Sequence, residues 1–107
     1  MQVKIKASKI ELTEAIQNYI NEKVSMLDKY LNHVDVLNCD FEIEKSVGGQ
    51  HKGDIFRAEI NLQVPGEILY VEKTESDLYK AIDKVKDHLA EVIKKYKEKK
   101  IDKKRKQ

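Results

Sequence analysis

The chain has 107 residues, and its 40% hydrophobic content is enough for one core but not for two. The single cysteine, Cys39, excludes an intramolecular disulfide and a cysteine-based zinc site, and no apolar N-terminal run resembles a signal peptide or a membrane span. We therefore expect one domain with a tail, located in the reducing cytoplasm and not in a membrane.

The net charge of +2 conceals an uneven distribution along the chain. Residues 1–93 contain 12 Lys and Arg against 17 Asp and Glu, whereas residues 94–107 contain 9 against 2. A basic end favours binding to a polyanion, because each lysine that neutralises a phosphate releases condensed counterions. A solvated, disordered tail would have the same composition, so charge alone leaves both interpretations open.

The first two elements differ in the period of their apolar residues. Val3, Ile5 and Ala7 alternate with polar residues, which predicts a half-buried strand. The period then becomes helical, and with Thr13 as the N-cap it predicts one helix from Thr13 to Leu31. Its apolar stripe consists of Ile16, Ile20, Val24, Leu27 and Leu31.

Three further strands follow. A period of two places Leu37, Cys39, Phe41 and Ile43 on the core face of the second strand. The glycine-rich segment 48–53 predicts a turn to a third strand, in which Phe56, Ala58, Ile60, Leu62 and Val64 face the core. Pro65 and Gly66 suit the centre of a type II turn, and a fourth strand is expected over about 67–74.

A second helix is predicted from an N-cap at Ser76 to about Glu98. Its apolar positions are Leu78, Ile82, Val85, Leu89, Val92 and Tyr96. The fold class is therefore α+β, in the order β-α-β-β-β-α, with two helices packed on one face of a four-stranded sheet. Residues 1–98 form the domain, and we expect residues 99–107 to be a basic, flexible C-terminal tail.

No group of residues predicts catalysis, a metal site or a cofactor. His33, His51 and His88 are scattered over different elements, and Gly48 and Gly49 open no helix that could cradle a phosphate. Cys39 on a core-facing strand position is typical of a small packing residue. An enzyme acting on a small molecule is the least favoured class, because no nucleophile is paired with a base.

Both helices carry basic and aromatic residues beside their apolar stripes. On the first helix, Tyr19, Lys23, Met26 and Tyr30 form a rail that could stack on bases and pair with phosphates, or could simply cover the margin of the core. On the second, one flank holds Tyr79, Lys86 and Lys97, and the other holds Lys84, His88, Lys95 and Lys99.

Several ordered motifs resemble the family of ribosome hibernation-promoting factors and ribosome-associated translation inhibitors, also called sigma-54 modulation proteins. The resemblance covers about residues 1–98. It rests on Met1-Gln2-Val3-Lys4-Ile5, Leu12-Thr13-Glu14-Ala15-Ile16, Phe56-Arg57-Ala58-Glu59-Ile60, Val64-Pro65-Gly66, Ser76-Asp77-Leu78-Tyr79-Lys80-Ala81-Ile82-Asp83 and Lys94-Lys95-Tyr96-Lys97.

The resemblance implies a domain similar to double-stranded RNA-binding modules that occupies the mRNA and tRNA channel of the small ribosomal subunit and promotes hibernation. It also implies that Lys23, Lys95 and Lys97 contact rRNA. With the motif residue Tyr79 and the lysines of the second helix and the basic end, the candidate rRNA-binding residues are Lys23, Tyr79, Lys86, Lys94, Lys95, Lys97, Lys99 and Lys100.

Three positions depart from the family pattern, because Met26, His88 and Glu91 stand where relatives often have basic residues. The length and the basic end resemble the short form of the family, which pairs ribosomes with help from a separate modulation factor. Two other functions remain open: a general binder of structured RNA, and a protein-interaction regulator of transcription.

Overall fold

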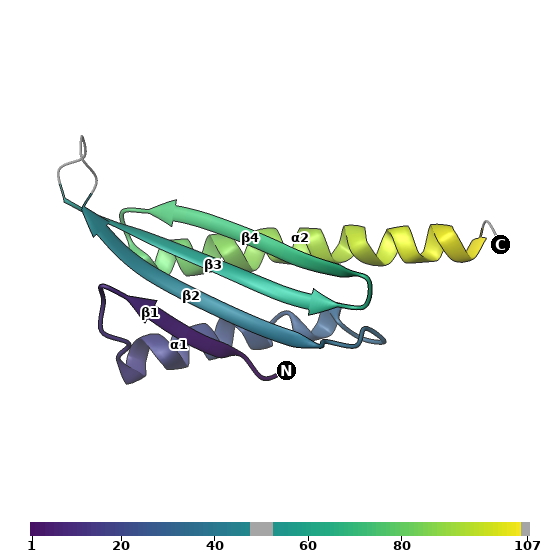
Figure 1. Cartoon of the computed structure of the whole chain (residues 1–107), viewed down its shortest axis with the longest axis horizontal. Coiled ribbons are helices and arrows are strands. Elements are labelled where there is room, and N and C mark those ends of the chain that lie inside the picture. Colours follow the sequence, from purple (N-terminus) through teal and green to yellow (C-terminus); the bar gives the residue numbers. More distant parts are fainter. Residues whose placement is uncertain (48–52, 106–107) are drawn as a thin grey trace.

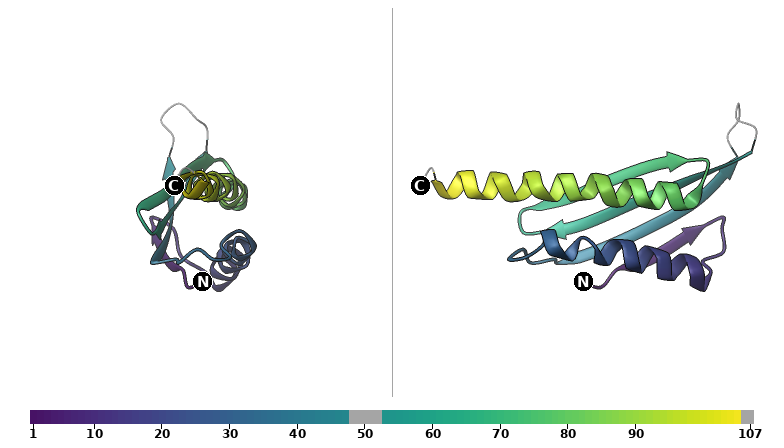
Figure 2. Two further views of the ribbon diagram at one scale, coloured as in Figure 1. Left: turned by 90° about the vertical axis from the view of Figure 1, so that its right-hand side faces the viewer. Right: turned by 180° about the vertical axis from the view of Figure 1, so that it is seen from behind.

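The computed structural model describes residues 1–47 and 53–105. Its elements are β1 (Lys4–Ser8), α1 (Glu14–Ser25), the 3-10 helix η1 (Asp28–Tyr30), β2 (Asn38–Val47), β3 (Asp54–Val64), β4 (Glu67–Glu75) and α2 (Leu78–Arg105). The predicted order is confirmed, and both helices lie on the same face of the sheet (Figure 1 and, seen end-on, the left view of Figure 2). The turn predicted over 48–53 lies almost entirely outside the described residues.

The sheet is mixed, with the strand order β1-β2-β3-β4. β1 pairs with β2 in parallel, whereas the β2–β3 and β3–β4 pairs are antiparallel. A parallel pair requires a crossover connection, which α1 provides. Side chains alternate between the two faces along each strand, so one face meets the helices and the other stays open.

The core lies between the helices and the inner face of the sheet. One inward row illustrates the register, since Ile5 pairs with Phe41, Phe41 with Ile60, and Ile60 with Val71. The buried core residues are Ile16, Ile20, Val24, Leu27, Leu31, Cys39, Phe41, Ile43, Ala58, Ile60, Leu62, Val64, Leu69, Val71, Leu78, Ala81, Ile82, Val85, Leu89, Ala90, Ile93 and Tyr96. The predicted core positions of the two helices are confirmed apart from Val92, which is only partly buried.

The prediction of one helix from Thr13 to Leu31 is wrong at its C-terminal end. Thr13 caps α1 as expected, its hydroxyl accepting from the amide of Ile16 at 3.2 Å. The hydroxyl of Ser25, however, donates to the carbonyl of Glu22 at 2.6 Å, and the amide of Met26 donates instead to the carbonyl of Lys23. A side chain that donates to a carbonyl in a helix competes with the backbone amide that would otherwise bond to that carbonyl. The chain therefore tightens into η1.

Two predicted positions at strand and helix ends are also wrong. Leu37, expected in the core, lies just before β2 and is 59% exposed, although its amide donates to the carbonyl of Gln63 in β3 at 2.8 Å. The N-cap of α2 is Asp77 rather than Ser76: its carboxylate accepts from the amides of Tyr79 at 2.8 Å and Lys80 at 3.3 Å.

Replacing Asp77 with alanine is expected to lower the free energy of unfolding by about 1 kcal/mol, because two amides of the first turn lose their acceptor. Urea denaturation followed by circular dichroism measures the change. Ser76→Ala is the matched control, and a loss for that variant as large as the loss for Asp77→Ala would contradict the assignment of the cap.

The far end of α2 differs from the sequence-based boundary. The helix predicted to end near Glu98 continues to Arg105, so the division expected at residue 98 falls inside α2. Tyr96 anchors the helix before this point, its hydroxyl donating to the carbonyl of Pro65 at 2.8 Å in the β3–β4 turn. In that turn Gly66 has φ +82°, as the predicted type II geometry requires. Beyond the turn, the helix projects past the sheet (Figure 1).

Candidate nucleic-acid interface

The outer surface of the helical layer contains a hollow between the end of α1, η1 and α2. Three lysines and two carboxylates share its lining with apolar and aromatic side chains. The lining residues are Met26, Lys29, Tyr30, Lys86, Asp87, Ala90, Glu91 and Lys94. Ammonium groups around a surface that can also take a flat ring or a ribose are suited to a nucleic-acid strand.

Tyr30 is the aromatic centre of this hollow. The Nζ atoms of Lys29 and Lys94 lie 5.1 Å and 5.2 Å from the centroid of its ring. Both distances are within the range of a cation–π interaction. Lys94 also contacts the carboxylate of Glu91 at 3.2 Å, so its charge is partly offset on the outer side. The ring of Tyr30 thus contacts one lysine from η1 and one from α2.

A second group of side chains joins α1 to the start of α2. The hydroxyl of Tyr19 donates to Oδ1 of Asp83 at 2.7 Å, and Nζ of Lys23 lies 3.4 Å from the same oxygen. Lys23 also lies 5.2 Å from the centroid of the Tyr19 ring, which packs edge-to-face on Tyr79 with centroids 4.7 Å apart. We call these four residues, Tyr19, Lys23, Tyr79 and Asp83, the interhelix cluster.

The hydrogen bond from Tyr19 changes the titration of its phenol. The Asp83 carboxylate accepts that bond, and together with partial burial and the charge of Asp83 it raises the pKa of Tyr19 to about 12. A hydrogen bond from the neutral phenol to a carboxylate favours the protonated form. Tyr19 is therefore neutral at physiological pH and is held as a donor to Asp83.

The predicted binding residues fall into two groups on the structure. Lys23 and Tyr79 meet in the interhelix cluster, and Lys86 and Lys94 line the hollow. Lys86 also pairs with Asp87 at 2.6 Å. These four predicted residues are thus brought together along the junction of the two helices.

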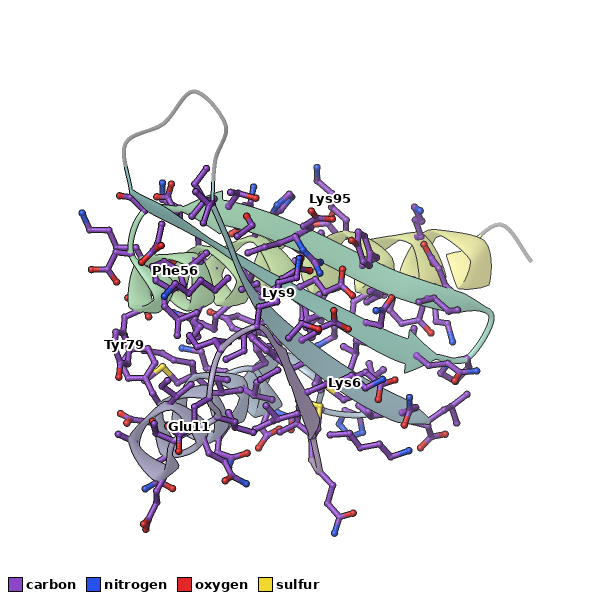
Figure 3. The ribbon with its side chains drawn as sticks, turned by 60° about the vertical axis from the view of Figure 1, so that its left-hand side comes forward. Lys6, Lys9, Glu11, Phe56, Tyr79 and Lys95 are labelled. Carbon is purple, nitrogen blue, oxygen red and sulfur yellow. The ribbon has the colours of Figure 1, made fainter. Side chains whose placement is uncertain are left out.

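The remaining predicted residues are distributed around α2. Lys99 pairs with Glu67 of β4 at 3.6 Å, and Lys100 lies 5.0 Å from the centroid of the Tyr96 ring. Lys97 is half-buried, whereas Lys95 is exposed and points away from the body of the protein (Figure 3). The structure therefore does not gather all eight residues into one site.

Lys29 is a residue of this surface that the sequence-based prediction missed. On a continuous α-helix, Lys29 lies opposite the apolar stripe, far from the rail of Tyr19 and Lys23. The tight turn of η1 and the long lysine stem instead bring its ammonium to the Tyr30 ring. The pairing of Lys23 with Asp83 was also missed, because it joins residues 60 positions apart in the chain.

The open face of the sheet has the opposite charge. One row across the strands consists of Lys6, Glu42, Glu59 and Glu72. Arg57, in the next row, pairs with three carboxylates: Glu42 at 3.1 Å, Glu44 at 2.7 Å and Glu59 at 2.6 Å.

These contacts shift the pKa values of several groups on the open face. The hydrogen bond that Arg57 donates to Glu44 lowers the pKa of Glu44, and the same bond contributes most to a raised pKa of Arg57. Tyr70 lies near Glu59 and Glu72, and its phenol pKa is raised by hydrogen bonds to them. The open face is therefore an ionised, acid-rich network, and a phosphate backbone would be repelled from it. The helical face is the surface suited to a polyanion.

Other kinds of site find less support in the described part of the chain. Burial raises the pKa of the Cys39 thiol to about 11, and its side chain is 1% exposed, as expected for a packing residue. Within residues 1–47 and 53–101, no three His, Cys, Asp or Glu side chains are grouped to hold a metal ion. None of the described helices combines the length and apolar content that crossing a bilayer requires.

Comparison with known families bears directly on this surface. The model of the family described as sigma 54 modulation protein / S30EA ribosomal protein matches residues 3–101. The chain belongs to this family. The match spans both helices that line the hollow and the whole sheet.

Individual relatives agree with the family. The chain is 30% identical over 99 residues to a ribosome hibernation promoting factor of Pseudomonas putida, covering 92% of this chain and 89% of that one. It is 32% identical over 88 residues to a ribosome hibernation promotion factor of Deinococcus radiodurans. That match covers 82% of this chain but 44% of the relative, so the chain spans less than half of the Deinococcus protein.

Solved structures share the fold. The N-terminal domain of Protein Y from Thermus thermophilus has a TM-score of 0.70 at 30% identity, covering 90% of this chain and 99% of that domain. A ribosomal subunit interface protein from Coxiella burnetii has a TM-score of 0.74 at 15% identity, covering 91% of this chain and 98% of that one, and shows the fold alone.

Proposed function

We propose that this protein binds the small ribosomal subunit, occupies its mRNA and tRNA channel through contacts with rRNA, and so keeps ribosomes in an idle, hibernating state in the cytoplasm. It acts by binding rather than by catalysis. Residues 1–98 supply the binding domain, and residues 99–107 add basic charge at its end.

The observation that carries this proposal is the division of charge between the two faces of the molecule. The helical face offers lysines and tyrosines at the junction of α1, η1 and α2, whereas the open face is an acid-rich network around Arg57. A channel lined with rRNA is a polyanion whose backbone can be read by shape without base-specific contacts. The names of the family relatives supply the ribosome as the partner.

The contacting residues that we propose are those of the two groups on the helical face and the end of α2. Lys23, Tyr79, Lys86 and Lys94 lie along the helix junction, and the solvent-facing side of α2 adds Lys95. Lys97, Lys99 and Lys100 extend the basic charge toward the projecting end of the helix. The tail and the last turns of α2 then compensate for Met26, His88 and Glu91.

Sedimentation tests the proposal directly. In a sucrose gradient at low salt with ribosomes in excess, the protein is expected to travel with small subunits and with whole ribosomes, and to inhibit translation in a cell-free system. Raising the salt from about 50 to 200 mM should weaken binding steeply, because the free energy gained by releasing counterions from several phosphates falls as the salt concentration rises. Protein that stays at the top of the low-salt gradient would contradict the proposal.

The same preparation separates ribosome binding from general RNA binding. A generic RNA duplex added at increasing concentration should displace little of the protein from ribosomes. Complete displacement at equal phosphate concentration would instead favour the general structured-RNA binder.

A further inference from the structure

We propose that Asp83 is a positioning residue that makes the RNA-binding surface selective, by holding Lys23 and Tyr19 in place and repelling polyanions that cannot use this arrangement. The inference rests on the proposed function and deepens it. It concerns one of the carboxylates that lie among the lysines of the helical face.

Asp83 connects α2 to two side chains of α1. A single oxygen, Oδ1, accepts the phenol of Tyr19 at 2.7 Å and pairs with the ammonium of Lys23 at 3.4 Å, and both partners come from α1. The side chain of Lys23 is only 20% exposed, and its ammonium lies over the Tyr19 ring. Asp83 thus fixes a lysine that would otherwise sample many rotamers.

The restraint extends to the aromatic surface. Tyr19, held by Asp83, packs its ring edge-to-face against Tyr79, which is 41% exposed. Edge-to-face packing restricts the orientation of both rings. One carboxylate therefore positions a cation and, through Tyr19, an exposed ring, and both residues are candidates for RNA contact.

An ammonium group has three donors, so Lys23 can still offer N–H groups to a phosphate while it is paired with Asp83. A partner whose phosphates match the fixed position benefits from this preorganisation. A generic duplex gains little from a fixed lysine, yet it still experiences the negative charge of Asp83. An unfavourable contact with the wrong partner is one route to specificity.

The test compares Asp83→Asn with Glu22→Gln. Asparagine has nearly the same shape, and its amide oxygen can still accept from Tyr19, but it cannot form the ion pair with Lys23. Glu22 is exposed on the neighbouring turn of α1, and its change to glutamine removes the same charge outside the interhelix cluster. Affinities for purified ribosomes and for a generic RNA duplex are measured at one salt concentration, after urea denaturation has shown that each variant is folded.

We expect Asp83→Asn to bind the duplex about three- to tenfold more tightly, and ribosomes no more tightly than the unchanged protein, so the preference for ribosomes falls by at least about three- to tenfold. Glu22→Gln should raise both affinities by similar factors and leave the preference unchanged. Equal preferences for the two variants would overturn the proposal.

The pKa of Tyr19 reports its interaction with Asp83 and can be measured by spectroscopy. Titration of phenol absorbance, with Tyr19→Phe identifying the signal of Tyr19, should show its pKa falling from about 12 toward the ordinary value near 10 in Asp83→Asn. An unshifted Tyr19 would overturn the positioning role. A wild-type protein without any preference for ribosomes would instead overturn the proposed function, whatever the variants do.

Discussion

Changing Lys95 and Lys97 together to glutamine is expected to weaken ribosome binding by roughly ten- to a hundredfold at low salt. Lys95 is exposed and Lys97 half-exposed near the end of α2, and neither change touches the core. The slope of the logarithm of affinity against the logarithm of salt concentration should become shallower by about two, because each lysine that contacts a phosphate contributes about one to that slope.

A matched control is available on the opposite face. Lys4 and Lys6 are exposed on β1 and belong to the rows of the open face, where they pair in register with Asp40 and Glu42. Changing both to glutamine removes the same charge from a surface that we do not expect to meet RNA. Binding titrations over a salt series compare the two double variants, and equal losses would refute the assignment of the helical face.

Replacing Leu89 with alanine is expected to lower the free energy of unfolding by about 3 kcal/mol. Leu89 is fully buried on α2, at 0% exposure, between the helix and the sheet. Truncation loses the transfer free energy of the side chain and leaves a cavity that the surrounding core cannot fully close. Since small domains are stable by only about 5–15 kcal/mol, this change is a large fraction of the total.

Leu37→Ala is the control for this prediction, because the deleted atoms are the same. The side chain of Leu37 is 59% exposed, so its loss should change stability by less than about 0.5 kcal/mol. Urea denaturation of both variants gives the two values. A loss at Leu37 as large as that at Leu89 would show that Leu37 packs in the core, and would contradict the prediction.

Most of the fold follows from patterns that are local in the chain. Alternation in β2 and β3 identifies Cys39, Phe41, Ile43 and Ile60 as inward-facing, because a strand reverses its side chains at every residue. The failures occur at element ends. Leu37 continues the alternation, but it precedes β2 and its side chain is exposed.

The candidate site was predicted less completely than the fold. Composition and the family resemblance identify the lysines and Tyr79, since residue type and motif are properties of the sequence. The side chains that pair with these lysines cannot be identified from residue type or motif. Asp83, Glu67, Asp87 and Glu91 pair with candidate lysines, and of these Asp87 and Glu91 are close in sequence to their partners, whereas Asp83 and Glu67 are not.

Patterns in the chain are enough to predict the order of elements, the core faces of the strands and helices, the membership of residues 3–101 in a family, and the basic charge of the end. These depend on short periods and on composition. The tertiary structure was needed to show that β1 lies parallel to β2, that Arg57 pairs with Glu42, Glu44 and Glu59 on the open face, and that Asp83 contacts Lys23 and Tyr19. Each of these depends on which distant segments pack together, because the distances between side chains of different elements are fixed by the fold and not by their spacing in the chain.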